Sequence, residues 1–130
     1  MKCVISSLLA IIFFAPCTLA QNNVQFSDIK AGMHDRWVER EALRVANMRA
    51  TNLHWLAEYK RATIISHKWR IVTLGDEIVC RVIHIELYCE KPGERCEMAD
   101  FTFKQKYHGD GYINKLTFVD AGQFIHIECE

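Results

Sequence analysis

Histidine and cysteine are the side chains in this sequence that could most readily bind a metal ion or take part in catalysis. The chain has six of each, and imidazole nitrogens and thiolates are the ligands that zinc prefers in proteins. Their spacing does not follow a zinc pattern, because the sequence contains neither His-x-x-x-His nor Cys-x-x-Cys. We expect His84 and His126 on strand faces instead, and we expect no metal site and no cofactor.

The other groups that could catalyse a reaction are also poorly arranged. A cysteine nucleophile needs a free thiolate beside a base, whereas the cysteines of the mature chain are expected to be oxidised. The Asp and Glu residues are scattered and form no pair suited to acid and base catalysis. We therefore expect that this protein is not an enzyme.

The first twenty residues have the pattern of a secretion signal. Lys2 supplies a positive start, Val4 to Ala15 form a short apolar block, and Thr18-Leu19-Ala20 ends in residues suited to signal peptidase. The apolar block is too short to span a membrane, and no later stretch could do so. We predict a signal peptide at residues 1–20 and one secreted, extracellular domain at residues 21–130.

The charge balance limits the class of partner. The whole chain has 16 basic and 16 acidic residues, and Lys2 is the only charge in the predicted signal peptide. A mature chain so close to neutrality is a poor ligand for nucleic acid or an anionic membrane. Its length suits one compact domain with a modest core, and we expect a monomer.

Because we expect the protein to be secreted, we expect its cysteines to form disulfides. Loss of Cys3 and Cys17 with the signal leaves four cysteines, which predict two disulfides in one of three connectivities. Cys89 and Cys96 bracket a turn-forming insert and are the easiest pair to close. Cys80 and Cys129 would then pair by default.

The elements that must position these groups are one helix and several strands. Apolar residues recur at helical spacing after Asp35, which can serve as the N-cap, and the helix is expected to end between Asn52 and Lys60. Beyond Ala62 only β-rich runs follow, with turns at Gly75-Asp76 and at 108–111. The expected strands are 62–74, 78–89, 112–119 and 124–129, with a short loop at 120–123. This order predicts an α+β fold in which an antiparallel sheet wraps around one long helix.

The same order of elements resembles the cystatin family, in particular its secreted type 2 members. Ala42-Leu43 with Ala46 falls where these proteins often carry Ala-Leu and a further Ala in the helix. Arg61-Ala62 sits where many have Arg-Ala, Gly75 at the glycine of the first hairpin loop, and Cys89 at the first disulfide cysteine. The resemblance covers the chain after Gly32 at low identity, and it implies a cystatin-like fold.

Cystatins inhibit papain-like cysteine proteases by inserting three segments into the active-site cleft. Carried over to this chain, the segments are Gly32, the first hairpin at 71–75 and the second hairpin at 120–123. The first hairpin keeps only the glycine of Gln-x-Val-x-Gly, and the second has neither Pro nor Trp. The contact residues that the resemblance implies are Gly32, Ile71, Val72, Thr73, Leu74, Gly75, Ala121 and Gly122.

The disulfides also depart from the family pattern. A Cys89–Cys96 loop fits the first bridge of the family but is shorter. Cys129 fits the final cysteine, whose usual partner near 110–112 is absent, so Cys80 is the candidate that is left. Whether Cys80 can reach it depends on strand register, since bridged Cα atoms lie within about 7 Å.

Two functions follow. The first is a secreted inhibitor of papain-like cysteine proteases, weak at most because the Gln, Val, Pro and Trp are missing. The alternative is a non-inhibitory, secreted module that binds another extracellular protein. Val72 and Leu74 bear on both: apolar residues exposed at a hairpin tip indicate a partner contact, whereas ordinary strand packing would expose only Gly75-Asp76. Trp37, Trp55 and Trp69 are expected in the core or on the helix flank.

Overall fold

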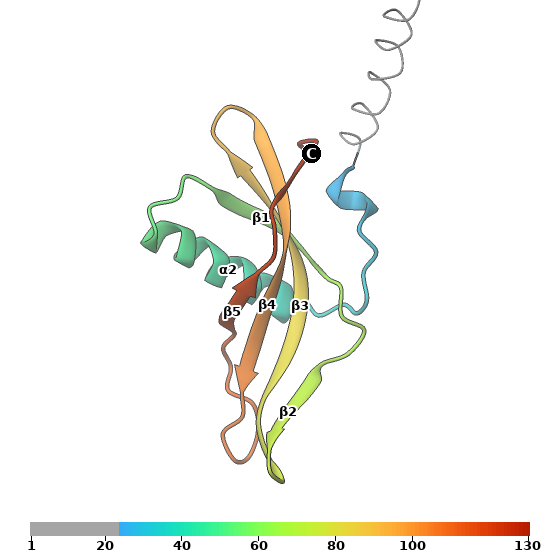
Figure 1. Cartoon of the computed structure of the whole chain (residues 1–130), viewed down its shortest axis with the longest axis vertical. Coiled ribbons are helices and arrows are strands. Elements are labelled where there is room, and N and C mark those ends of the chain that lie inside the picture. The colour runs from blue at the N-terminus through green and yellow to red at the C-terminus, as the bar shows by residue number, and fades with distance from the viewer. Residues whose placement is uncertain (1–23) are drawn as a thin grey trace, which may run out of the picture.

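The computed structural model describes residues 24–130 (Figure 1). In this range it has one α-helix, α2 (Arg36–Asn52), and a short 3-10 helix, η1 (Phe26–Asp28). The strands are β1 (Glu58–Ile64), β2 (Arg70–Leu74), β3 (Glu77–Lys91), β4 (Arg95–Lys106), β5 (Thr117–Ala121) and β6 (Ile125–Ile127). The predicted signal peptide, residues 1–20, lies outside the described residues. No helix within residues 24–130 is long and apolar enough to cross a bilayer.

All strand pairs belong to one antiparallel sheet. The strands β1, β3, β4 and β5 are neighbours in that order, β2 continues the β1 side of β3, and β6 pairs with β4. The helix α2 lies across the sheet, with the β2–β3 hairpin at the lower end of the molecule and the β3–β4 hairpin at the upper end (Figure 1). A six-stranded antiparallel sheet with one helix confirms the predicted α+β class.

The helix begins where the sequence indicates. The side chain of Asp35 accepts a hydrogen bond from the Val38 amide at 3.1 Å, which satisfies one free donor of the first turn. The helix ends at Asn52, the first position of the expected window, and His54 turns the chain with a φ of 59°. Its buried face consists of Val38, Ala42, Val45, Ala46 and Ala50. These small residues let the helix approach the sheet closely.

Both faces of the long β3–β4 hairpin are covered at its upper half. Ile83, Ile85, Leu87, Ala99, Phe101 and Phe103 point toward α2 and form the main core with it. On the opposite face, Phe26, Tyr88, Cys96, Met98 and Ile127 form a second, smaller cluster. Tyr88 lies between Leu87 and Cys89, so both faces are apolar at this end of the expected strand 78–89 and its alternation is imperfect.

The expected first strand, 62–74, is wrong as a single element. The region holds the end of β1, which begins earlier at Glu58, and the whole of β2, and the residues between them, 65–69, leave the ladder. The side chain of Ser66 accepts a hydrogen bond from the His84 amide at 2.9 Å, so a hydroxyl replaces the backbone partner that a continuous strand would supply. The amide of Gly32 donates to the Ile64 carbonyl at 2.8 Å at the same break. The N-terminal segment thus packs where the strand is interrupted.

The last expected strands are shifted. Tyr112 forms only an isolated bridge to Tyr107, and regular pairing with β4 begins at Thr117. The loop between β4 and β5 is therefore 107–116. The loop expected at 120–123 is also wrong in its bounds, because Asp120 and Ala121 pair with β4 as the end of β5 and the connection to β6 is 122–124. The final strand, expected at 124–129, is reduced to β6 at Ile125–Ile127.

The expected disulfide pairing is also wrong. The structure joins Cys96 to Cys129, with Cα atoms 5.2 Å apart, and leaves Cys80 and Cys89 as free thiols. In the β3–β4 register Cys89 faces Glu97 and Cys96 faces Glu90, so the two cysteines project from opposite faces. Cys89 points into the main core and Cys96 into the smaller cluster.

Cys80 cannot replace either partner. It pairs with Lys106 near the start of β3, whereas Cys96 pairs with Glu90. Ten strand residues separate these positions, a distance of about 33 Å.

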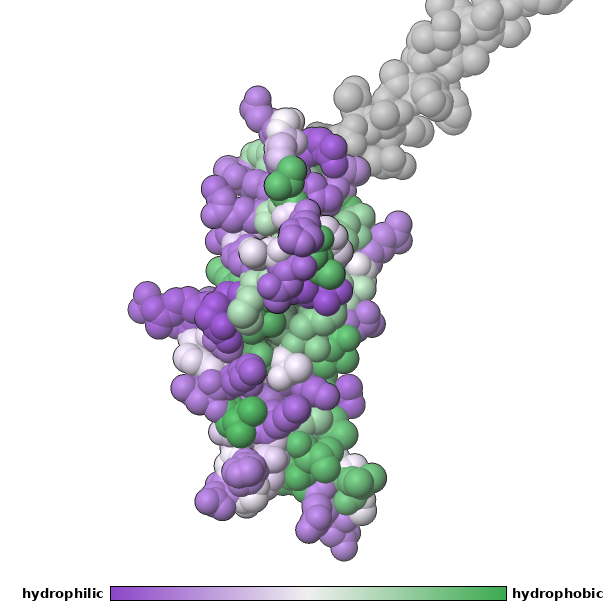
Figure 2. Space-filling view, turned by 90° about the vertical axis from the view of Figure 1, so that its left-hand side faces the viewer, coloured by the Kyte–Doolittle hydropathy of each residue, from purple (hydrophilic) through white to green (hydrophobic). Residues whose placement is uncertain are grey.

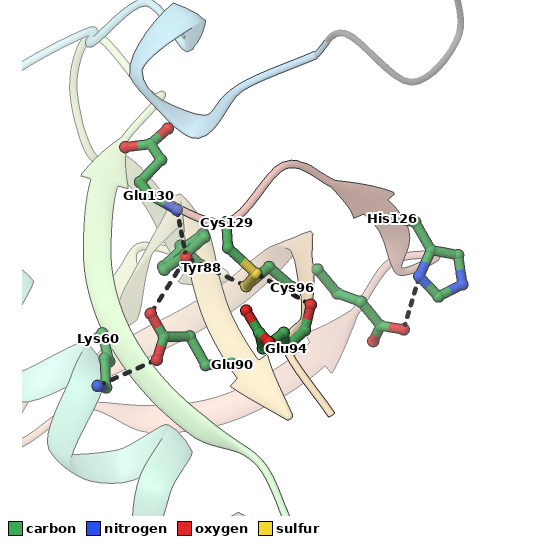
Figure 3. Close-up of a disulfide and its surroundings, with 9 residues drawn as sticks. Lys60, Tyr88, Glu90, Glu94, Cys96, His126, Cys129 and Glu130 are labelled. Carbon is green, nitrogen blue, oxygen red and sulfur yellow. Dashed lines mark hydrogen bonds and ion pairs between the residues drawn. A yellow bond between two sulfur atoms is a disulfide. The ribbon is translucent and has the colours of Figure 1, made fainter. Parts of the chain in front are cut away.

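The observed bridge fixes the C-terminus on the sheet (Figure 3). The Tyr88 hydroxyl accepts a hydrogen bond from the Glu130 amide at 2.9 Å and lies 3.2 Å from a carboxylate oxygen of Glu90. Arg61 forms an ion pair with Glu130, and Ser27 donates its amide to the same carboxylate at 2.8 Å. Both terminal segments are therefore held together at the upper end of the sheet.

Candidate functional site

The tip of the β2–β3 hairpin is exposed and apolar. Gly75 takes a φ of 65°, a left-handed conformation that glycine adopts without strain, and this closes the turn with Asp76. Leu74 is 76% exposed and Ile71 48% exposed. The interpretation of ordinary strand packing, with only Gly75-Asp76 exposed, is therefore wrong.

The apolar tip continues onto β3, where Ile78 and Val79 are also exposed. Figure 2 shows green, apolar atoms gathered at the lower end of the molecule, where Figure 1 places this hairpin. Thr73 is exposed and Val72 half-buried, and a β-bulge between these two residues shifts the register against β3. We call Ile71, Leu74, Ile78 and Val79 the hairpin patch.

A second loop lies beside this hairpin. The amide of Tyr107 donates to the Val79 carbonyl at 3.0 Å, and the ring centroids of Tyr107 and Tyr112 are 5.1 Å apart. A cavity of about 410 Å³ lies between the two loops, lined by Asp76, Glu77, Ile78, Tyr107 and Gly109. The segment that the fold brings to the hairpin tip is therefore 107–116, in which the sequence predicted a turn at 108–111 and the start of a strand at 112.

Ala121 and Gly122 lie elsewhere. Ala121 pairs with Phe101, and the Gly122 amide donates to the Asp100 carbonyl at 2.7 Å. Position 100 lies six residues along β4 from its end at Lys106, about 20 Å from the loop. The structure does not bring these two residues to the hairpin patch.

Gly32 has a packing role at the break between β1 and β2. A Cβ atom added there would lie 2.4 Å from the Ser66 carbonyl oxygen and 2.6 Å from that of Ile65. Only glycine allows this close approach of two backbones. The residues that precede Gly32 include η1, which bonds to the C-terminal residue Glu130. The N-terminal segment therefore lies at the upper end of the molecule (Figure 1), away from the hairpin patch.

The base of the hairpin is held by one arginine. The guanidinium of Arg81 lies between two rings, 3.9 Å from the Trp69 centroid and 4.1 Å from that of Tyr112. Its Nε donates to Gln105 at 2.8 Å, and the buried Gln105 donates to the Ile113 carbonyl at 2.7 Å. Burial lowers the pKa of Arg81 from its ordinary value. Stacking and hydrogen bonds together tie the hairpin to the loop 107–116.

Two carboxylates do meet, although the sequence suggested no such pair. Glu86 and Asp100 face each other across β3 and β4. Burial raises the pKa of both side chains, and the Asp100 charge raises that of Glu86 further. His84 lies 3.8 Å from Asp100 and shares a hydrogen bond with Thr102 at 3.0 Å. The pairing depended on a strand register that the sequence did not specify.

The two free thiols of residues 24–130 are Cys80 and Cys89. Burial raises the pKa of the Cys89 thiol to about 11, so this group stays protonated at neutral pH. Cys80 is half-buried, on the face of β3 that points away from α2. Within residues 24–130 no three His, Cys, Asp or Glu side chains are grouped so as to hold a metal ion.

No known protein family, no curated protein and no solved structure matches this chain. The likeness to cystatins therefore stays a prediction from the motifs.

Proposed function

We propose that this protein is a secreted, cystatin-like inhibitor that places its β2–β3 hairpin in the active-site cleft of a papain-like cysteine protease, and that it inhibits weakly. The observation that carries the proposal is the exposure of Leu74 at the tip of a hairpin whose base is fixed. Leu74 is largely exposed to water, so a partner that covers this apolar side chain lowers the free energy of the complex.

The neighbouring loop 107–116 could help the hairpin to fill and block the protease cleft. It lies next to the hairpin through the Tyr107–Val79 hydrogen bond, so both loops can meet one surface. The stacked Arg81 limits the motion of the hairpin against this loop, which reduces the entropy lost on binding. No covalent step is involved in this mechanism, because the loops act by filling the cleft.

The same geometry explains why inhibition should be weak. The N-terminal segment and Ala121-Gly122 lie away from the hairpin patch, so only one of the three expected segments, the hairpin at 71–75, can enter the cleft there, with the loop 107–116 beside it. The tip also lacks a large aromatic anchor, a kind of side chain that often contributes about 2 kcal/mol or more to an interface.

A second candidate function is a non-inhibitory module that binds another extracellular protein through the hairpin patch. The position of the N-terminal segment favours it, because Gln25 and Ser27 bond to Glu128 and Glu130 at the end opposite the hairpin. Both candidates use the same surface and differ in the partner that covers it.

Titration of the mature protein, residues 21–130, against papain and cathepsins L and B separates them. Inhibition constants in the micromolar range support the inhibitor, while no inhibition at about 100 μM would reject it and leave the second candidate. Leu74→Asp should weaken any inhibition about tenfold or abolish it. Val119→Asp is the matched control, since it places the same charge on an exposed β5 position outside the hairpin patch.

A further inference from the structure

A cavity of roughly 670 Å³ lies at the upper end of the sheet, where three segments far apart in sequence meet. They are the residues after α2, the β3–β4 turn, and Phe124 between β5 and β6. A volume of this size is typical of small-molecule sites. The cavity lies near the end of β3 opposite the hairpin patch, about 45 Å along the strand, so it is separate from the proposed function.

The walls of the cavity are apolar and unusually exposed. Leu56 is 77% exposed and Trp55 46% exposed, so Trp55 is not in the core; it lies at the end of α2, with the Arg49 guanidinium 5.7 Å from its ring centroid. The left-handed turn at His54 holds this segment, and the Trp55 amide donates to the Ala50 carbonyl at 2.8 Å. Tyr59 and Phe124 complete the apolar surface.

The rim of the cavity is positively charged. Glu97 is the one carboxylate in the lining, and it is buried between two basic groups, 2.7 Å from Lys91 Nζ and 3.4 Å from His126 Nδ1. The Lys91 contact is an ion pair without hydrogen-bond geometry. Arg95 also lines the cavity, is exposed, and forms no ion pair with any carboxylate of residues 24–130. Its charge is therefore available to a ligand.

We propose that this cavity binds a small amphiphilic anion, with its apolar body on Trp55, Leu56 and Phe124 and its carboxylate head at Arg95. Charge complementarity selects this occupant: Glu97 is already paired with Lys91, so a ligand ammonium would have to displace Lys91, whereas an anion meets a free guanidinium. A neutral ligand of the same length would gain only the apolar contact.

Three probes with straight ten-carbon chains test the charge preference. Decanoate, decanol and decyltrimethylammonium are titrated below their micellar concentrations into ¹⁵N-labelled mature protein, and amide shifts are followed by NMR. Decanoate should bind saturably, about tenfold more tightly than decyltrimethylammonium. The amide shifts should cluster at Leu56, Arg95 and Phe124.

Charge reversal at the rim supplies the second arm. Arg95→Glu should weaken decanoate about fivefold or more and leave decanol unchanged. Arg70→Glu, the same change at an exposed position of β2, should leave both unchanged.

Equal affinity for the cationic probe, unsaturable binding, or shifts centred outside the cavity would overturn the proposal. Shifts of the lining amides that depend on protein concentration without any probe would also overturn it, because a second copy of the chain would then cover the cavity.

Discussion

Breaking the Cys96–Cys129 bridge is the perturbation whose effect on stability can be worked out most directly from the structure. Cys129 is exposed, so Cys129→Ser removes the cross-link with little loss of packing. The bridge anchors the segment that carries β6 and the Glu130 contacts to Tyr88 and Arg61. Its loss should loosen this end of the sheet.

The size of the effect follows from the loop that the bridge closes. The two cysteines are 33 residues apart, and the chain-entropy relation for such a loop gives a loss of about 3.5–4 kcal/mol in the free energy of unfolding. A domain of this size has a total stability of about 5–15 kcal/mol. The variant should therefore unfold at a much lower denaturant concentration than the wild type.

Urea unfolding of the oxidised proteins, followed by tryptophan fluorescence, measures this loss. Cys80→Ser is the control at a half-buried free thiol and should cost no more than about 0.5 kcal/mol. Cys89→Ala removes a buried sulfur that is not cross-linked and should cost about 1 kcal/mol through lost packing.

A Cys89→Ala loss as large as that of Cys129→Ser would refute this connectivity. Peptide mapping without reduction that finds Cys89 linked to Cys96 would refute it equally.

Three further changes have defined outcomes. Gly32→Ala forces a Cβ atom against two carbonyl oxygens and should lower the free energy of unfolding by about 1–3 kcal/mol. Gly111→Ala is the control, because a Cβ atom there meets open space. Urea unfolding compares the two variants, and equal stability of both would contradict the packing role of Gly32. The raised pKa of Glu86 means that the folded protein keeps this proton to higher pH than the unfolded chain, so its ionisation costs stability as the pH rises above about 4.3. Glu86→Gln should therefore raise the free energy of unfolding by about 0.5 kcal/mol at pH 7 and have little effect at about pH 3.5. Urea unfolding at both pH values measures this difference. A variant less stable than the wild type at pH 7 would contradict the prediction. Leu74→Asp should leave the thermal midpoint within about 2 °C of wild type, because the side chain is already in water, and a large drop in calorimetry would mean that the tip is packed.

The helix and the first turn could be predicted because their signals are local. Asp35 precedes an apolar stripe and satisfies an amide of the first turn, and Gly75-Asp76 separates two β-rich runs. Each of these signals acts over a few residues, so no tertiary contact was needed to interpret it.

The failures all depend on tertiary contacts. The break at 65–69 arises because Ser66 bonds to His84 on a neighbouring strand and Gly32 packs against it, which no local propensity reveals. The cysteine pairing depends on hairpin register: a shift of one residue decides whether Cys89 and Cys96 share a face. Proximity in sequence favoured the wrong pair.

The candidate site was predictable in part for the same reason. The hairpin at 71–75 carried its own turn signal, but its neighbour in space is set by the Tyr107–Val79 contact rather than by a motif. The exposed Trp55 and Leu56 were missed because their stretch reads as a continuation of the helix, which ends at Asn52.

Steady-state inhibition of papain by the mature protein and its Leu74→Asp variant tests the central claim most directly. The account predicts an inhibition constant in the micromolar range for the wild type. Burial of the exposed part of Leu74 contributes about 1–2 kcal/mol, so the variant should inhibit about tenfold more weakly or not at all. Nanomolar inhibition by the wild type, or an unchanged constant for Leu74→Asp, would contradict it.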